Sequence, residues 1–160
     1  YVAWAFRKVS DPVSSWKYGA VAIITLLHDV SIPVGVFAYL GHFFGVEIDM
    51  LFISGILTIL GFSVHDTIVV FDRIREKLLR EKARGLFEDI VERSVKETIV
   101  RSINTSLTAI AALTAVFFFG GETTRFMSLL LIIGMAVGVY SSIFIASPLL
   151  VSFERIKKRA

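Results

Sequence analysis

Residues 126–151 read FMSLLLIIGMAVGVYSSIFIASPLLV, an unbroken stretch without a single charged side chain. A helix needs about 20 apolar residues to cross the hydrocarbon core of a bilayer. This stretch therefore predicts a transmembrane helix, and three similar stretches occur at about 18–40, 50–71 and 102–119. Hydrophobic residues make up 55% of the 160, and the mean hydropathy is +0.73, beyond the apolar content of soluble domains. We predict an all-α fold, a polytopic transmembrane helix bundle that forms one membrane domain over residues 1–160.

The charged residues between the apolar stretches predict how the bundle is oriented. Lys and Arg are concentrated in the segment 72–101, at the C-terminus (155–159) and in the linker before residue 18. The connections at 41–49 and 120–125 are short, and Arg125 is the single Lys or Arg that they contain. Because basic segments stay on the cytoplasmic side, 72–101 and the C-terminus are predicted in the cytoplasm, and the two short connections outside. The net charge of +3 thus indicates contact with a lipid bilayer, and nucleic acid is not an expected partner.

The cytoplasmic segment 72–101 contains a helical pattern of its own. Apolar or small residues recur at three-to-four spacing with charges on the other face, which predicts an amphipathic helix along the membrane interface. They are Phe87, Ile90, Val91, Val95, Thr98 and Ile99. A solvated connector shielded by helix ends is the alternative. Residues 1–8 resemble the last turns of a helix, so further residues are expected upstream.

Ionisable side chains occur inside the predicted spans, where they are costly and usually mark an ion or substrate pathway. His28 and Asp29 lie near the middle of the stretch 18–40, and His65 and Asp66 lie in the cytoplasmic third of 50–71. Arg101 begins the stretch 102–119. The second and third spans run in opposite directions, so Asp66 and Arg101 are expected at similar depth as a charge pair. The alternative is that these groups only hydrogen-bond the helices together.

Polar and small residues also share faces with these charges. One face of the second span holds Gly55, Ile59, Ser63, Asp66, Thr67 and Val70, and one face of the third holds Arg101, Asn104, Thr105, Thr108 and Ala112. Such stripes can carry water or protons. The candidates for a proton pathway are therefore Asp66, Arg101, Thr105, Asp29, His65 and His28. Gly134 and Gly138 form a GxxxG pattern, which predicts a site of close helix packing.

Other chemistries fit the sequence less well. Cysteine is absent, and neighbouring His and Asp on a helix point about 100° apart, so no metal site is predicted. The two aspartates suggest an intramembrane aspartyl protease, but Asp66 lacks the glycine-flanked setting of such enzymes. Motifs for nucleophilic catalysis, phosphate binding and dinucleotide binding do not occur. We therefore expect no enzyme and no cofactor, with protons as the coupling ion.

Two long stretches resemble a known family. Residues 61–76 read GFSVHDTIVVFDRIRE, and residues 101–150 read RSINTSLTAIAALTAVFFFGGETTRFMSLLLIIGMAVGVYSSIFIASPLL. Both are similar to SecF, the smaller half of the SecD–SecF pair in the resistance-nodulation-division superfamily. The SecD helix has Ala-Asn after its acidic residue, whereas Asp66 is followed by Thr67 and Ile68. The segment around His28 and Asp29 also resembles a SecF helix.

The resemblance implies a function and an assembly. SecD and SecF of bacteria associate with the SecYEG channel in the inner membrane and use proton flow to assist preprotein export. Asp66 matches the membrane acid of the SecF motif, and Arg101 matches the arginine before its Asn-Thr-Ser. The family usually has Asn where this chain has His65, and it has an earlier helix and a large extracytoplasmic domain upstream of Tyr1. Two alternatives stay open: a proton-coupled lipid or drug exporter of the same superfamily, and a non-transporting membrane scaffold.

Overall fold

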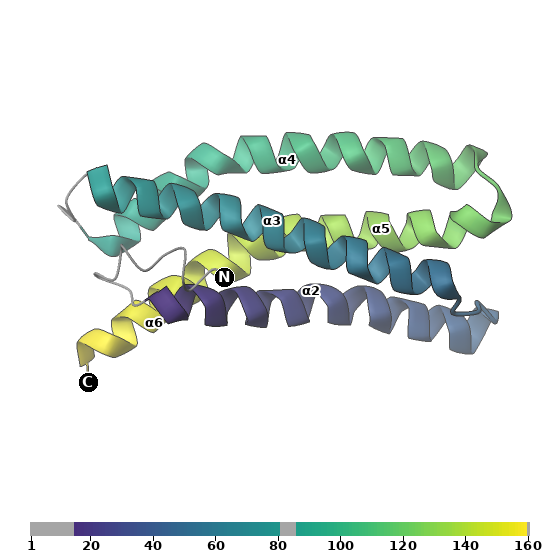
Figure 1. Cartoon of the computed structure of the whole chain (residues 1–160), viewed down its shortest axis with the longest axis horizontal. Coiled ribbons are helices and arrows are strands. Elements are labelled where there is room, and N and C mark those ends of the chain that lie inside the picture. The colour runs from purple at the N-terminus through teal and green to yellow at the C-terminus, as the bar shows by residue number, and fades with distance from the viewer. Residues whose placement is uncertain (1–14, 81–85, 160) are drawn as a thin grey trace.

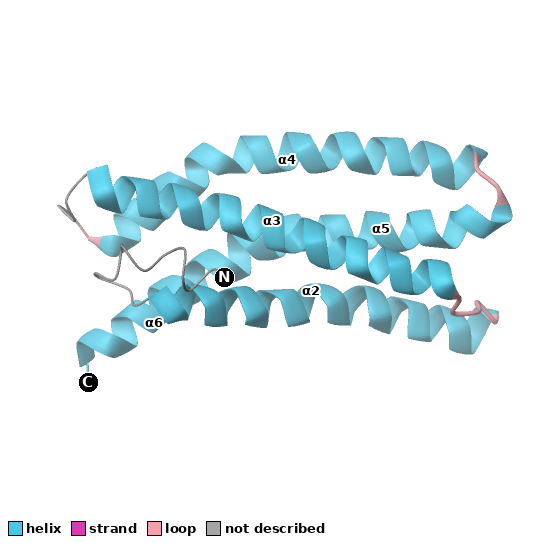
Figure 2. Cartoon of the chain, in the orientation of Figure 1, coloured by secondary structure: helices cyan, strands magenta, loops and turns pink. Residues whose placement is uncertain are grey.

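The computed structural model describes residues 15–80 and 86–159, which form long helices joined by short connections (Figure 1, Figure 2). In chain order they are α2 (Ser15–Phe44), α3 (Met50–Arg80), α4 (Phe87–Phe119), α5 (Glu122–Ser141), η1 (Ser142–Ala146) and α6 (Ser147–Arg159). Within the described residues, four helical segments are long and apolar enough to cross a membrane. The predicted all-α membrane bundle is confirmed. The predicted helix end at residues 1–8 lies outside the described residues.

The helices lie side by side along the long axis of the molecule, and α5 is central among them (Figure 1). α5 packs against α2, α3 and α4, whereas α4 packs mainly on α5 and α3. In the most apolar stretch of the rod formed by α5, η1 and α6, half of the residues are buried. In the most apolar stretch of α4, 11% of the residues are buried. Helix α4 therefore lies at the outside of the bundle and exposes most of its surface.

Two apolar clusters hold the bundle together, one toward each end. The first joins α2, α3 and α5 near the short connections and contains Phe37, Phe52, Ile59, Leu130 and Leu131. The second joins α2, α3, α4, η1 and α6 near the other end; it contains Tyr18, Val21, Val70, Phe71, Ile74, Leu78, Phe87, Ile90, Val91, Ala146 and Leu150. Between them every long helix contributes buried polar residues. The candidate functional site is this polar layer, which the two apolar clusters separate from both ends.

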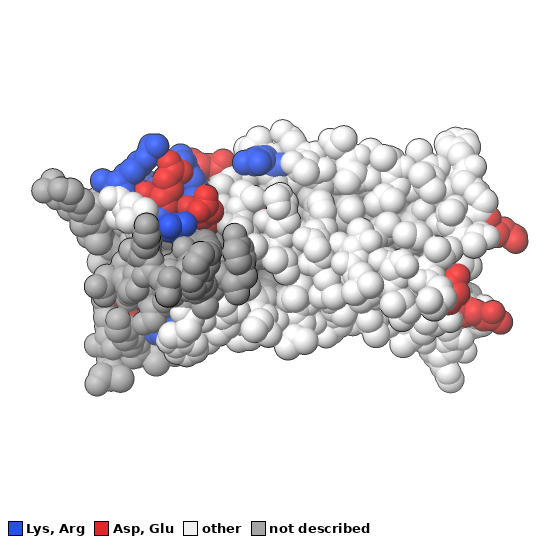
Figure 3. Space-filling view, in the orientation of Figure 1, with Lys and Arg blue, Asp and Glu red and all other residues white. Residues whose placement is uncertain are grey.

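On the face shown in Figure 3, most charged side chains lie toward the two ends of the molecule, and most of the length between them is uncharged. At the end that holds α6, ion pairs connect different helices. Glu97 of α4 accepts hydrogen bonds from Arg73 and Lys77 of α3, at 2.7 and 2.6 Å, and Arg155 of α6 donates two hydrogen bonds of 2.6 Å to Glu88. The distribution of charge is that of a protein with two polar ends and an apolar middle.

The structure confirms that the predicted amphipathic stretch from Phe87 to Ile99 is helical, but it joins this stretch to the third span. Residues 72–80 continue α3, and residues 87–101 are the first half of α4, not a separate helix. Figure 1 shows this first part of α4 inclined to the rest of the helix. Two hydroxyls in it donate to backbone carbonyls of the preceding turn, Ser94 to Ile90 at 2.7 Å and Thr98 to Ser94 at 3.0 Å. Back-bonding of this kind often bends helices.

A π-helical turn, η1, interrupts the rod formed by α5 and α6. Pro148 lies two residues after η1 ends. Its ring lacks an N–H and crowds the carbonyl of the fourth preceding residue, Phe144, which lies inside η1. The regular α-helical ladder therefore cannot pass through this point. A π-turn inserts one residue into the helix, and such turns are frequent at functional sites.

Candidate functional site

Asp66 of α3 is a buried carboxylate held by two serine hydroxyls. The residue is 7% exposed. Ser102 of α4 donates to Asp66 Oδ1 at 2.7 Å, and Ser142, the first residue of η1, donates to Asp66 Oδ2 at 2.6 Å. The carboxylate thus joins three helical segments at the level where the rod changes from α- to π-helix.

Asp29 of α2 forms a second site of the same kind and is fully buried. Ser63 of α3 and Ser141 of α5 both donate to Asp29 Oδ2, the latter at 2.7 Å. His28 Nδ1 lies 3.0 Å from Asp29 Oδ1. Pro33 follows four residues later in α2, so the backbone carbonyl of Asp29 lacks its usual α-helical N–H donor. Two serine hydroxyls, an imidazole and this backbone carbonyl thus lie close to the Asp29 carboxylate.

The two carboxylate sites share their supporting elements. Ser63 and Asp66 are one turn apart on α3, and Ser141 and Ser142 are consecutive at the junction of α5 and η1. One residue of each pair belongs to the Asp29 site, and the other belongs to the Asp66 site. The helical period predicts Ser63 on the face of Asp66 but assigns no role to Ser102, Ser141 or Ser142. The sequence signal for Ser141 and Ser142 is that two hydroxyl residues are adjacent in a span without charged side chains.

The predicted pair of Asp66 with Arg101 is absent from the ion pairs and hydrogen bonds of the described residues. Arg101 is exposed and lines a surface depression of about 400 Å³ together with Asp72, Glu97 and Thr98, among others. Adjacent helical residues point about 100° apart. Because α4 turns Ser102 toward Asp66, Arg101 must face away from it. Thr105, on the face of Arg101, is also exposed.

The two predicted histidines differ in their surroundings. The side chain of His28 is 34% exposed and contacts the carboxylate of Asp29. His65 is exposed, although it precedes the buried Asp66. Thus the structure brings Asp29 together with His28, and the described contacts give His65 no hydrogen bond to either aspartate.

The glycines of the GxxxG pattern lie where α5 meets α3. A Cβ added to Gly134 would lie within 2.9 Å of three carbon atoms of Ile59. A Cβ added to Gly138 would lie 3.5 Å from Ser63 Cβ and 4.0 Å from Asp29 Oδ2. The lack of side chains at these positions lets α3 approach α5 closely, and the hydroxyl of Ser63 reaches Asp29 at this seam.

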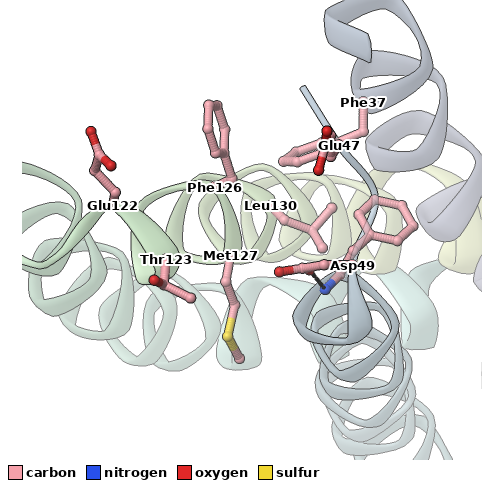
Figure 4. Close-up of a pocket in the computed structure, with 9 residues that line it drawn as sticks. Phe37, Glu47, Asp49, Glu122, Thr123, Phe126, Met127 and Leu130 are labelled. Atoms are coloured by element: carbon pink, nitrogen blue, oxygen red, sulfur yellow. Dashed lines mark hydrogen bonds between the residues drawn. The ribbon is translucent and has the colours of Figure 1, made fainter. Parts of the chain in front are cut away.

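A separate depression lies at the end with the short connections (Figure 4). Its lining combines apolar side chains with three carboxylates, those of Glu47, Asp49 and Glu122. Asp49 Oδ1 accepts a hydrogen bond of 2.9 Å from the backbone N–H of Phe52 and so caps the start of α3. No group of three metal-ligating side chains was found among the described residues.

Comparison with known proteins places these residues in a family. The chain matches the family described as protein export membrane protein SecD/SecF, C-terminal, over residues 13–156. It belongs to the SecD/SecF family.

Relatives within the SecD/SecF family carry the SecF name. The chain is 58% identical over 154 residues to protein translocase subunit SecF of Thermobaculum terrenum, covering 96% of the chain and 47% of the relative. It is 51% identical over 132 residues to that of Synechocystis sp., covering 82% of the chain and 42% of the relative. The chain therefore spans about half the length of these curated relatives. The predicted resemblance to SecF is confirmed.

A solved structure of the SecD/SecF family has the same fold. A crystal structure of SecDF in the super-membrane-facing form aligns with a TM-score of 0.84 and 37% identity, covering 99% of this chain and 20% of that one. The arrangement of helices around the two aspartates thus belongs to a domain that occurs within a much larger protein.

Proposed function

We propose that the chain is the membrane part of a SecF subunit, which assists preprotein export across the bacterial inner membrane by using the proton-motive force. Membership of the SecD/SecF family and the names of the SecF relatives support protein export. The observation that carries the proton-coupled mechanism is the Asp66 carboxylate, which is buried in a membrane-spanning helix without a paired cation among the described residues. Covalent catalysis and an organic cofactor have no part in this mechanism.

The partners of Asp66 suit a group that changes its protonation state. An ionised carboxylate only accepts hydrogen bonds, whereas a protonated one also donates. Serine hydroxyls can do both, so Ser102 and Ser142 can serve either state by rotating their protons. In this mechanism Asp66 takes up and releases a proton, and its hydrogen bonds to α4 and η1 rearrange each time. This rearrangement shifts the balance between two arrangements of the helices.

An exposed polar face of α4 supports a binding site for a partner in the membrane. Its face with Arg101, Asn104, Thr105 and Thr108 is exposed in this chain. Polar and charged groups facing lipid are costly, so this face is covered by protein or borders a water-filled cavity in the membrane. We propose that helices of SecD cover it and that Arg101 and Thr105 take part in the proton pathway between the two subunits. SecYEG and the preprotein are further partners in this scheme.

The test is export into inverted membrane vesicles with and without a proton gradient, using the full-length protein with SecD. Asp66→Asn keeps the shape of the side chain but removes its titration, so we expect loss of the gradient-stimulated part of export. Asp89→Asn is the control, because Asp89 is an exposed aspartate in the first turn of α4. Arg101→Lys keeps the charge without the planar guanidinium, and a partial defect is expected.

A scaffold without transport is the second candidate, because the four serine bonds to the aspartates also join helices. It predicts that Asp66→Asn, present at wild-type amount, retains gradient-stimulated export at the wild-type rate. That result would contradict the proposed role of Asp66 and favour the scaffold.

A further inference from the structure

We propose that Asp29 is a second proton-binding carboxyl and that Ser141 and Ser142 couple its protonation to that of Asp66; this rests on the proposed uptake of protons by Asp66. The ligand of the second site is a proton, and its coupling element is the junction of α5 and η1. Three features of the structure carry the inference: the alternative acceptors of the two serines, the shared junction and the charges around both sites.

Each of the two serines has two acceptors within reach. Ser141 Oγ lies 2.7 Å from Asp29 Oδ2 and 3.0 Å from the carbonyl of Gly138. Ser142 Oγ lies 2.6 Å from Asp66 Oδ2 and 3.0 Å from the carbonyl of Val139. A hydroxyl has one proton to donate. Each serine can therefore donate its proton either to a carboxylate on a neighbouring helix or to a backbone carbonyl of its own helical segment.

The protonation state of the carboxyl determines which of the two acceptors receives the serine proton. A hydrogen bond to an ionised carboxylate is shorter and stronger than one to a neutral carbonyl, so the serine donates to the ionised aspartate. When the carboxyl binds a proton, it can donate to the serine oxygen, and the serine proton then turns to its own helix. The proton count balances, because only the carboxyl gains a proton and the serine keeps its own.

The two choices are linked because Ser141 and Ser142 are consecutive residues. Ser142 begins the π-turn η1, where Pro148 interrupts the regular ladder of backbone hydrogen bonds. Ser147, after the turn, donates its hydroxyl to the carbonyl of Ser142 at 3.2 Å. A backbone rotation that follows the state of one aspartate therefore also moves the hydroxyl that serves the other. Asp29 and Asp66 are linked again through α3, which carries Ser63 and Asp66 one turn apart.

The described ion pairs place few charged partners at the two carboxylates. The described ion pairs include one contact to either carboxylate, that of His28 with Asp29, and it is ionic only when His28 is protonated. From α3 the nearby titratable group is His65, which is exposed, and from α4 it is Arg101, also exposed. Residues 126–146 of α5 and η1 contain no charged side chain, and Tyr140 there is 54% exposed. Proton uptake thus removes charge that the surrounding helices do not neutralise.

The test is an infrared titration of the full-length protein in complex with its membrane partner, with aspartate carboxyls isotopically labelled. We expect two buried carboxyl bands that titrate with pH, one removed by Asp29→Asn and the other by Asp66→Asn. In Asp29→Asn, the midpoint of the remaining band should shift by about one pH unit or more, as in coupled sites. In the background of Ser141→Ala with Ser142→Ala, the same substitution should shift it by less than half as much.

Controls separate the possible results. Ser128→Ala removes a buried hydroxyl of α5 that donates to the carbonyl of Thr124, so it should leave the coupling unchanged, and Ser142→Thr keeps a hydroxyl and should retain the coupling. The inference is overturned if the Asp29 band does not titrate, or if the full shift survives loss of both hydroxyls. It is also overturned if Ser128→Ala weakens the coupling as much as Ser141→Ala with Ser142→Ala does. Absence of a titrating Asp66 band would instead refute the proposed function.

Discussion

The contact of Gly134 with Ile59 yields a prediction about the packing of α5 against α3. Gly134→Ala adds a Cβ that would lie within 2.9 Å of three atoms of Ile59, namely Cγ1, Cγ2 and Cδ1. Ile59 is 1% exposed and cannot move its side chain into open space. The two helices must therefore separate locally, which loosens the seam that also carries Gly138 and Ser63.

The size of the effect follows from a comparison with Gly61. A Cβ added to Gly61 of α3 meets no atom within 4 Å. Gly61→Ala should therefore show only the gain in helix propensity, up to about 1 kcal/mol. Overpacking of a core typically costs about 1–3 kcal/mol. After both variants receive the same propensity gain, Gly134→Ala should be less stable than Gly61→Ala by about 1–3 kcal/mol, or about 5- to 150-fold in the folding equilibrium.

The assay is detergent-induced unfolding of the full-length protein in mixed micelles, measured for both alanine variants. Ile59→Ala removes all three crowded atoms, so adding it to Gly134→Ala should abolish most of the cost assigned to the clash. A double-mutant cycle then gives a coupling free energy of about 1–3 kcal/mol between the two positions. Equal stability of Gly134→Ala and Gly61→Ala, or strict additivity in the cycle, would refute the close approach of α3 and α5.

Further predictions concern the charged end and the orientation. Hydrogen bonds from Lys77, and to a lesser extent from Arg73, lower the pKa of Glu97. These ion pairs therefore stabilise the fold at pH values above the ordinary pKa of a glutamate. The stabilisation is lost as the pH falls through the lowered pKa of Glu97. Glu97→Gln should reduce thermal stability slightly at neutral pH, with no difference from wild type in acid, and the neutral-pH difference should shrink at high salt. Single cysteines at Thr123 and Lys96 should be labelled from outside and from the cytoplasm, respectively, in a chain without native cysteine; labelling of position 96 from outside intact cells would contradict the orientation.

Sequence alone was sufficient for the architecture and for the location of the unusual groups. Four long apolar stretches predict four spans, because the thickness of the bilayer fixes the length of a spanning helix. Asp29 and Asp66 were identifiable because a carboxylate inside such a stretch is costly and needs a reason. The motif around Asp66 also indicated the SecF type, which the relatives confirm.

The extent of the helices depended on more than hydropathy. The charged segment 72–101 was expected to be a separate interfacial element, but its residues extend α3 and begin α4. Hydropathy marks where a helix leaves the lipid and not where it ends. The cross-helix ion pairs of Glu97 and the burial of Phe87 and Ile90 keep the helices continuous beyond the apolar stretch.

The partners of the aspartates were decided by tertiary structure. The helical period shows that Arg101 and Thr105 share one face of α4 and that Ser102 and Ser106 share another, but it does not show which face meets Asp66. That depends on the rotation of α4 about its axis, which its packing on α5 and α3 sets. A rotation of α4 by about 100° about its axis decides whether Arg101 or Ser102 faces Asp66. In the structure Ser102 faces it, so Asp66 accepts a hydrogen bond from a hydroxyl in place of the charge pair expected from depth alone.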